Sequence, residues 1–533
     1  MDKKSDGSET VFDAVIVGSG AGGGPMALSL AQAGWKVLVL EKGPRWSRRD
    51  YDHETGISPG AFVPAVEEDP HTVVTRKTTR PLLTSLGWIA SCVGGGTVHM
   101  GGYFYRFLPD DFRMKSRFGD YEELEDWPFT YEELEPFYAE AERELGVSGA
   151  AGADPFEGPR STPYPLPPLS AHPFASRVEA ACKSRGLHPF PTPRAIVSQE
   201  YDGRPACEYC PRCASYGCPV GARSSSQEAL LPKAERTGNC EVRAGAMVFR
   251  ILVEGDRATG CLYFDAEGRE HRVRARVVCV AGSAIESARL LLASGTAAFA
   301  DGLGNENGLV GRHLQFHGVT MGQGRFETGR PGLEALADPH PMLGRSVMDH
   351  YFLPDGVSEL AKGGVIRFGM APQVPAPGPF PVGPDDRVLY FEGFHDFIPN
   401  RHTFVSLDPE VKDRWGLPVA RIHLDLPAHQ KKAGAFLADR AFEVLSDLGA
   451  SQLALTDLGG TSSYLVHGTC RAGHDPRRSV LDAHCRVHSL RNLYVVDGSF
   501  MPTSGGAAPT LTIVANSFRV ARHLREKGLR REI

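Results

Sequence analysis

One unit near the N-terminus constrains the fold more than any other part of the chain. Residues 12–18 (FDAVIVG) form a short apolar run typical of a buried strand. The glycine-rich turn GSGAGGG follows, then residues 26–34 (MALSLAQAG), which predict a helix closed by Gly34, and then a second strand over residues 35–43 (WKVLVLEKG). A strand, a glycine turn, a helix and a strand in this order predict an α/β fold with a parallel sheet.

The glycines of this turn have separate tasks. Gly18 makes the tight turn, Gly20 lets the backbone approach a pyrophosphate, and Gly23 lets the helix pack on the strand. Glu41, at the end of the second strand, is placed to accept hydrogen bonds from ribose hydroxyls. The unit therefore predicts a dinucleotide site. Glutamate rather than arginine at the strand end disfavours NADP, but the motif leaves FAD and NAD open.

Three later segments favour a flavin. Residues 91–106 (SCVGGGTVHMGGYFYR) are rich in glycine and permit close backbone approach to a flat or anionic ligand. Residues 272–295 predict a second strand, turn and helix. Residues 491–524 predict a strand ending in Asp497, a loop, and a helix that begins near Pro509. The N-terminus of that helix would suit the negative charge at a flavin N1/O2 edge.

The chain resembles the glucose-methanol-choline (GMC) oxidoreductases in five blocks that occur in family order. These blocks are GSGAGGGPMALSLAQAG, VGGGTVHMGG, AGSAIESARLLLASG, HGTCRAGHDPRRSVLD and NLYVVDGSFMPTSGG. Residues 105–149 are similar to the large, flavin-bearing subunit of bacterial sugar and gluconate dehydrogenases. The resemblance implies an FAD-dependent dehydrogenase that removes hydride from a CH–OH group of an alcohol or sugar-like substrate. Electrons would pass to a small carrier or a redox partner protein; an oxidase that uses O2 is the alternative with the same fold.

The resemblance also implies the fold: α/β (α+β overall), with a discontinuous Rossmann-type FAD-binding domain and a substrate domain built on an antiparallel sheet. The expected FAD domain comprises residues 10–115, 205–325 and 465–533, and the substrate-binding or cap domain comprises 116–204 and 326–464. The alternating segments DRVLYFEGF (386–394) and VARIHLDLP (419–427) suit strands of the substrate-domain sheet.

The family pattern implies a set of FAD contacts in this chain. They are Gly18, Gly20, Ala21, Gly23, Glu41, Gly95, Thr97, His99, Val248, Gly282, Asp497, Gly498, Pro509 and Thr510. In some relatives a histidine at the position of His99 carries FAD covalently. Covalent attachment and a histidine packed against the flavin both remain open.

The family's catalytic pattern is altered here. Its usual block is H-x-x-G-T, with a polar partner around N-P-T-L-T. Aligned on Gly468-Thr469, the usual histidine position holds Leu465, and the usual partner position holds Ala508. His467 lies two residues later and is the first candidate for the base that accepts the substrate proton.

Two alternatives to a His467 base remain. Tyr464, or a histidine of the substrate domain such as His350 or His395, would act from across the pocket. Otherwise the chemistry is not alcohol oxidation, because a flavin can support desaturation, lyase or isomerase reactions without the histidine pair. A histidine bonded to a backbone carbonyl is the structural alternative for His467.

Four of the 11 cysteines, Cys207, Cys210, Cys213 and Cys218, form the pattern C-x2-C-x2-C-x4-C-P. Closely spaced cysteines with a proline after the last are typical of iron–sulfur ligands. Some sugar-dehydrogenase-like relatives hold such a cluster in a cysteine-rich segment here. We expect either a metal or iron–sulfur centre or a thiol-rich loop over the FAD.

The formal net charge of −6 argues against a nucleic-acid partner, which needs a basic face. No run of about 18 apolar residues predicts a membrane span. No signal peptide is recognisable, so a cytoplasmic location is expected, with export alongside a signal-bearing partner subunit as the alternative.

Overall fold

The computed structural model describes residues 11–52, 59–78, 80–88, 90–121, 123–210, 213–327, 331–370, 386–530 and 532. The strands are β1 Val11–Val17, β2 Val37–Leu40, β3 His71–Thr75, β4 Leu82–Thr84, β5 Phe190–Pro191, β6 Cys240–Arg243, β7 Met247–Glu254, β8 Arg257–Phe264, β9 Glu270–Val280, β10 Gln315–Glu327, β11 Arg345–Val347, β12 Gly364–Met370, β13 Asp386–His395, β14 Phe404–Lys412, β15 Pro418–Leu424, β16 Gln452–His467 and β17 Leu493–Val495. The α-helices are α1 Gly23–Gln32, α2 Met114–Phe118, α3 Tyr131–Leu145, α4 Ala175–Ser184, α5 Leu231–Arg236, α6 Ala284–Ala293, α7 Ala428–Asp447 and α8 Thr510–Leu529.

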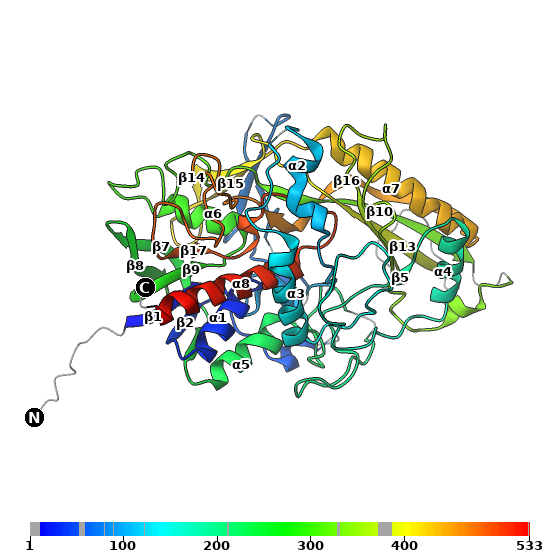
Figure 1. Cartoon of the computed structure of the whole chain (residues 1–533), viewed down its shortest axis with the longest axis horizontal. Helices are drawn as coiled ribbons and strands as arrows, with labels where there is room; N and C mark the ends of the chain where they lie inside the picture. The colour runs from blue at the N-terminus through cyan, green and yellow to red at the C-terminus, as the bar shows by residue number, and fades with distance from the viewer. Residues whose placement is uncertain are drawn as a thin grey trace, which may run out of the picture.

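The first sheet has seven strands and a Rossmann-type core. Its order is β6-β2-β1-β9-β8-β7, and β17 also pairs with β9. The pairs of β1 with β2 and β9, of β2 with β6, and of β17 with β9 are parallel. Helix α1 packs on β1 and β2, α8 packs on α1, and α3 packs on α8 (Figure 1). The predicted strand–helix–strand unit is confirmed, although α1 already begins at Gly23, because the glycine turn leads directly into the helix.

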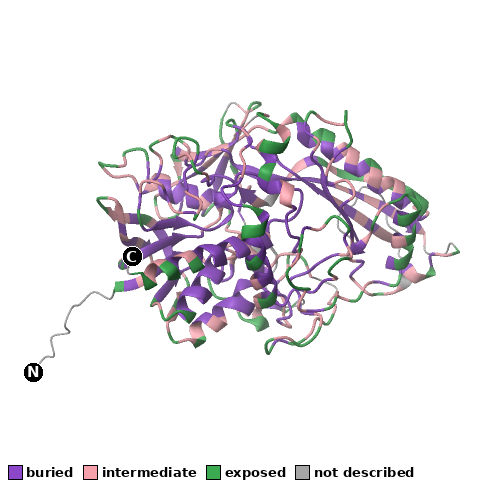
Figure 2. Cartoon of the chain, in the orientation of Figure 1, coloured by how far each residue is buried: buried purple, intermediate pink, exposed green. Residues whose placement is uncertain are grey.

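The second sheet has six strands in the order β16-β10-β13-β12-β11-β5, and every pair in it is antiparallel. Helix α7 packs on β10, β13 and β16 (Figure 1). Buried leucines and phenylalanines fill the space between α7 and the strands, while exposed residues follow the outer side of the helix (Figure 2). This is the antiparallel sheet that the sequence predicts for the substrate side.

A third sheet of four strands, β14-β15-β3-β4, corrects one expectation. The segment VARIHLDLP does form a strand, β15, but β15 pairs with β14 and β3 and not with the six-stranded sheet. An alternating pattern identifies a strand and one buried face, but it does not identify the partner strand. Strand β3 lies in the predicted FAD domain and β15 in the predicted substrate domain, so this sheet crosses the predicted boundary. The domain division stays a prediction.

Among the described residues, none of the helices combines the length and the apolar character that crossing a membrane requires.

Candidate active site

A cavity of about 560 Å³ is lined at one end by the turn between β1 and α1 and at the other by the six-stranded sheet. Gly18 has a φ of +97°, and a Cβ there would lie 2.3 Å from the Ala281 carbonyl oxygen. A Cβ at Gly23 would lie 2.0 Å from the Gly18 oxygen. Gly20 lines the cavity, and a Cβ there would have no protein atom closer than 3.8 Å. Gly18 and Gly23 therefore serve the fold, and Gly20 leaves space for a ligand.

Glu41 is a buried carboxylate that follows β2 and lines the cavity. Its Oε2 accepts hydrogen bonds from Ser19 N (3.1 Å) and Ser19 Oγ (2.6 Å), and its Oε1 accepts one from Gly43 N (3.0 Å). Burial raises the pKa of Glu41, and the hydrogen bonds from Ser19 and Gly43 oppose that effect. These bonds fix the carboxylate beside the glycine turn, where a ribose can reach it.

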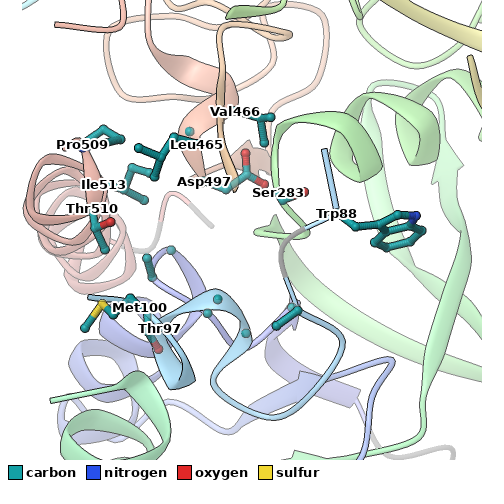
Figure 3. A pocket seen from close by; sticks show the side chains of 18 of the residues that line it. Trp88, Thr97, Met100, Ser283, Leu465, Val466, Asp497, Pro509, Thr510 and Ile513 are labelled. Atoms are coloured by element: carbon teal, nitrogen blue, oxygen red, sulfur yellow. The ribbon is translucent and has the colours of Figure 1, made fainter. Parts of the chain in front are cut away.

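Two helix N-termini reach the cavity. Neither α1 nor α8 has a side-chain N-cap bond or an acidic residue in its first turn, so the backbone N–H groups there can bind an anion. Pro509, Thr510 and Ile513 of the α8 end form one wall, and Thr97 and Met100 lie across from them (Figure 3).

The segment around Gly95 closes one side of the glycine turn. A Cβ at Gly95 would lie 3.2 Å from the Gly20 Cα, so the two backbones nearly touch. Thr97 Oγ1 donates to the Gly94 carbonyl (2.6 Å) and accepts a hydrogen bond from Ser226 N (2.9 Å). The His99 ring, which lines the cavity, stacks on Phe62 with 5.2 Å between ring centroids.

Asp497 lies at the carboxyl side of β17 and lines the cavity (Figure 3). It accepts hydrogen bonds from Ser287 Oγ (2.5 Å) and Ser499 N (2.9 Å). Burial raises the pKa of Asp497, and the serine hydrogen bonds oppose that effect. The carboxylate therefore has a fixed orientation near both the turn and the α8 N-terminus.

All the predicted FAD contacts except Gly23 line this cavity, from Gly18 and Glu41 at one end to Val248, Gly282 and Gly498. Gly23 instead packs α1 against β1. The sequence thus predicts the position of these residues in one site. Their contacts with a cofactor stay a prediction.

His467 lies at the end of β16 and lines the cavity with its side chain fully buried. Among the described residues, neither ring nitrogen has a hydrogen-bond partner. Burial holds the pKa of His467 well below its usual value, and the neighbouring His317 adds to this. A neutral imidazole with free nitrogens can accept a proton from a bound ligand. A bond from His467 to a backbone carbonyl, the structural alternative, is absent from the part of the chain described.

Leu465 and Ala508 also line the cavity, next to His467 and Pro509. The two positions that are polar in the family pattern are therefore apolar walls here. His467 is the histidine that this part of the wall provides.

The alternative bases have different positions. Tyr464 lies within β16, but its side chain falls outside the described residues. His395 is fully buried and does not line the cavity, and His350 packs its ring against Phe436 of α7. His467 is therefore the better placed of the described candidates.

A polar group that was not predicted from the sequence lies at the sheet end of the cavity. Arg367 of β12 is buried, its Nη1 donates to the Tyr390 hydroxyl (3.2 Å), and it forms an ion pair with Glu392. Its guanidinium lies 3.8 Å from the ring centroid of Tyr103. The sequence does indicate that Tyr390, Glu392 and Phe394 lie on one face of β13, because they occupy alternate positions of this strand.

The cysteine-rich segment does not bear out the metal prediction. Cys207, Cys210, Cys213 and Cys218 line a separate cavity of about 20 Å³. Within the described ranges, no group of three or more His, Cys, Asp or Glu side chains is placed to hold a metal ion. The Cys213 sulfur instead accepts a hydrogen bond from the buried Arg223 (3.2 Å). Close spacing brings thiols into one region, but it does not set the tetrahedral directions that a cluster needs.

This segment also contacts one wall of the main cavity. Arg223 Nη1 donates to the Val98 carbonyl (2.7 Å), and Ser215 N donates to the His99 carbonyl (2.8 Å). Ser215 lines the main cavity. The thiol-rich loop is therefore hydrogen-bonded to one wall of the main cavity. That it lies over the FAD stays a prediction.

Comparisons with known proteins agree with this arrangement. Residues 167–319 and 399–517 match the two parts of the GMC oxidoreductase family model. The chain is 34% identical over 529 residues to 6'''-hydroxyparomomycin C oxidase of Streptomyces lividus, with 97% of this chain and 91% of that protein covered. It is 28% identical to the fructose dehydrogenase large subunit of Gluconobacter japonicus, with 96% and 97% covered.

Solved structures share the fold. Pyridoxine 4-oxidase from Mesorbium loti superposes with a TM-score of 0.64 at 20% identity, with 97% of this chain and 99% of that chain covered. The resemblance that the sequence blocks indicate is thus confirmed by the family model, by full-length relatives and by the fold. The chain belongs to the GMC oxidoreductase family.

Proposed function

We propose that this protein binds one FAD and oxidises a CH–OH group of a small, hydroxyl-rich substrate. One observation carries the proposal: a single cavity is lined by the dinucleotide turn, by a buried histidine that has no hydrogen-bond partner among the described residues, and by a polar patch on an antiparallel sheet. Relatives point the same way, since they include an oxidase named for paromamine and dehydrogenases named for fructose and for 2-methyl-1,2-propanediol.

The residues present fit FAD. Gly20 leaves open space beside the α1 N-terminus for a pyrophosphate, and Glu41 is fixed where it can accept the ribose hydroxyls. Asp497 and the α8 N-terminus would hold the ribityl side and the N1/O2 edge of the flavin. We also propose that the chain is divided into an FAD domain and a substrate domain.

Bound FAD would supply a hydride acceptor for the carbinol C–H bond. His467, which lines the cavity, then accepts the hydroxyl proton at a ring nitrogen, because the ring is neutral. Leu465 and Ala508 exclude water beside it. Arg367, Tyr390 and Glu392 orient the substrate by hydrogen bonds to its other hydroxyls.

We expect electrons to pass to a carrier or a redox partner protein in preference to O2. The relatives include an oxidase and the large subunit of a dehydrogenase. The test compares turnover with an artificial electron acceptor under nitrogen and turnover with O2 alone. Faster turnover with the acceptor is expected. Equal or faster turnover with O2, with peroxide formed, would identify an oxidase instead.

A second candidate function rests on Leu465 and Ala508. Because both usual polar positions are apolar walls, a flavin reaction that needs no base pair, such as desaturation, is the competing proposal. A deuterium isotope effect on the carbinol C–H bond during electron transfer to FAD supports alcohol oxidation.

The cytoplasmic location stays a prediction.

Replacing Glu41 by glutamine should weaken FAD binding by about ten- to a hundredfold, because a hydrogen bond to a charged partner is worth about 1.5–3 kcal/mol. Equilibrium titration of apoprotein with FAD measures this. Glu241→Gln, which changes an exposed carboxylate on the adjacent strand β6, is the matched control and should bind FAD normally. Wild-type affinity in Glu41→Gln would remove Glu41 from the site.

A further inference from the structure

One carboxylate of the main cavity has no positively charged neighbour. Asp457 of β16 lines the cavity and is half-buried. Burial raises its pKa, and the backbone N–H groups of Leu458 and Gly460 oppose that effect, but no basic side chain of the described residues does. The proposed oxidation assigns no role to Asp457.

Asp457 belongs to a row of four side chains that crosses the six-stranded sheet. Met321 of β10 pairs with Asp457 of β16 on one side and with Glu392 of β13 on the other. Glu392 in turn pairs with Arg367 of β12. Directly opposite residues of antiparallel strands share one face of the sheet, and all four of these residues line the main cavity. The row therefore presents to the cavity a carboxylate, an apolar side chain, a carboxylate and a guanidinium.

The charges of this row do not balance. Of the lysines and arginines among the described lining residues, Lys42 forms an ion pair with Asp69, and Arg367 forms one with Glu392. Neighbouring strands lie about 4.8 Å apart, so the backbones of Asp457 and Arg367, three strand spacings apart, are separated by about 14 Å. Asp457 thus contributes a negative charge to this end of the cavity that no described side chain compensates.

The backbone around Asp457 makes room for its carboxylate. The pairing register of β16 with β10 shifts on both sides of the pair that Asp457 forms with Met321. Such bulges bend a strand and redirect its side chains. A Cβ at Gly460 would lie 2.5 Å from both carboxylate oxygens of Asp457, so a larger residue at position 460 would displace the carboxylate.

Two other groups indicate independently that this cavity holds a polar ligand. His467 is fully buried and Arg367 is 4% exposed, and both line the cavity. Among the described residues, neither ring nitrogen of His467 and not the Nε of Arg367 has a hydrogen-bond partner. Because buried polar atoms are nearly always paired, these atoms call for a ligand or water in the cavity. Asp457 is therefore part of the wall of a polar ligand site.

The distance between His467 and Asp457 limits the kind of ligand that contacts both. Their partners on β10 are Gln315 and Met321, which are six residues apart along the strand. At the rise of a β-strand this corresponds to about 20 Å between backbones. A single sugar ring is shorter than that span. A ligand that contacts both residues therefore has at least two rings, and Asp457 meets a ring other than the one at His467.

We propose that Asp457 binds a protonated amine of the substrate, which is a hydroxyl-rich compound of two or more rings with the amine on a ring that is not oxidised. The inference rests on the proposed oxidation. An ammonium group supplies the positive charge that the row lacks and has three N–H donors for the carboxylate oxygens. A hydroxyl at the same place has one donor and leaves the charge uncompensated, and a sugar acid would be repelled.

The test compares three disaccharides that share one β-1,4-linked skeleton: the glucosamine dimer with free amines, its N-acetylated form, and cellobiose. Calorimetry measures their binding to the holoprotein at about pH 6, below the usual pKa range of amines, so the result does not depend on turnover. We expect the glucosamine dimer to bind about ten- to a hundredfold more tightly than the other two, as is usual for a hydrogen bond between charged groups. Asp457→Asn should abolish this preference, and Asp457→Glu, which keeps the charge, should retain most of it.

Asp439→Asn is the matched control, because Asp439 is an exposed aspartate of α7. It should show the wild-type preference. Equal binding of the three disaccharides by the wild type, or an unchanged preference in Asp457→Asn, would overturn the assignment of Asp457 while leaving the oxidation intact. If no hydroxylated compound transfers electrons to FAD, the proposed oxidation itself fails, and the amine is then not part of a substrate.

A compound of the amine class that is oxidised provides a second readout. Asp457→Asn should raise its KM by about ten- to a hundredfold and change its kcat little, because the contact is made equally before and during the reaction. A fall in kcat with KM unchanged would contradict a binding role for Asp457.

Discussion

Replacing His467 by alanine should slow electron transfer from substrate to FAD by about 10²–10⁴-fold, the usual contribution of a positioned general base. His467 is the described histidine that lines the cavity with both ring nitrogens free. FAD content should not change. Stopped-flow measurement of flavin absorbance after mixing with substrate gives the rate directly.

The pH dependence provides a second readout for His467. Burial lowers its pKa, so the ring stays neutral and able to accept a proton well below pH 6.5. The rate should therefore not fall as the pH is lowered through 6.5, and the decline should come at lower pH. His423→Ala, a histidine outside the cavity, is the control. An alanine variant at position 467 that reduces its flavin at the wild-type rate would shift the assignment to Tyr464 or to non-alcohol chemistry.

Replacing Gly20 by leucine should abolish FAD binding and give colourless protein. A Cβ at this position meets no protein atom closer than 3.8 Å, and Gly20 lines the cavity where we expect the pyrophosphate, so a larger side chain should compete with FAD for that space. Visible absorbance of the purified variant gives the FAD content. Gly20→Ala, with a single added carbon, should lose less.

Thermal unfolding of the apoproteins distinguishes a ligand effect from a folding defect. The unfolding temperature of Gly20→Leu apoprotein should match that of wild-type apoprotein. Gly18→Ala is the contrasting variant, because φ is +97° there and the new Cβ would lie 2.3 Å from the Ala281 oxygen, so it should lower the unfolding temperature. Full flavin content in Gly20→Leu would refute the nucleotide site.

The residues of the proposed nucleotide site could be predicted from the sequence because their signals are local. The turn after β1 depends on Gly18, whose positive φ favours glycine. Glu41 and Asp497 follow from spacing along the chain, since each lies just after a predicted strand. Short-range sequence patterns specify such sites, and the structure brings these residues into one cavity.

The substrate half depends on long-range pairing, which local pattern does not specify. Arg367 contacts Tyr390 and Glu392 because β12 pairs with β13. Strand β15 pairs with β3, which lies far away in the sequence. The four cysteines of residues 207–218 also show that local spacing does not determine which side chains meet in the fold. Their spacing was suggestive, but the fold directs Cys213 to Arg223 and forms no ligand set in the described segment.

We propose that electrons pass from a CH–OH group of the substrate to FAD in this cavity. An anaerobic titration of the purified holoprotein with a panel of sugars, amino sugars and diols tests it most directly, with flavin absorbance and the carbonyl product measured together. We predict that at least one hydroxylated compound bleaches the flavin with one carbonyl formed per FAD. If a chemical reductant bleaches the flavin but no compound of the panel does, the proposed oxidation is contradicted.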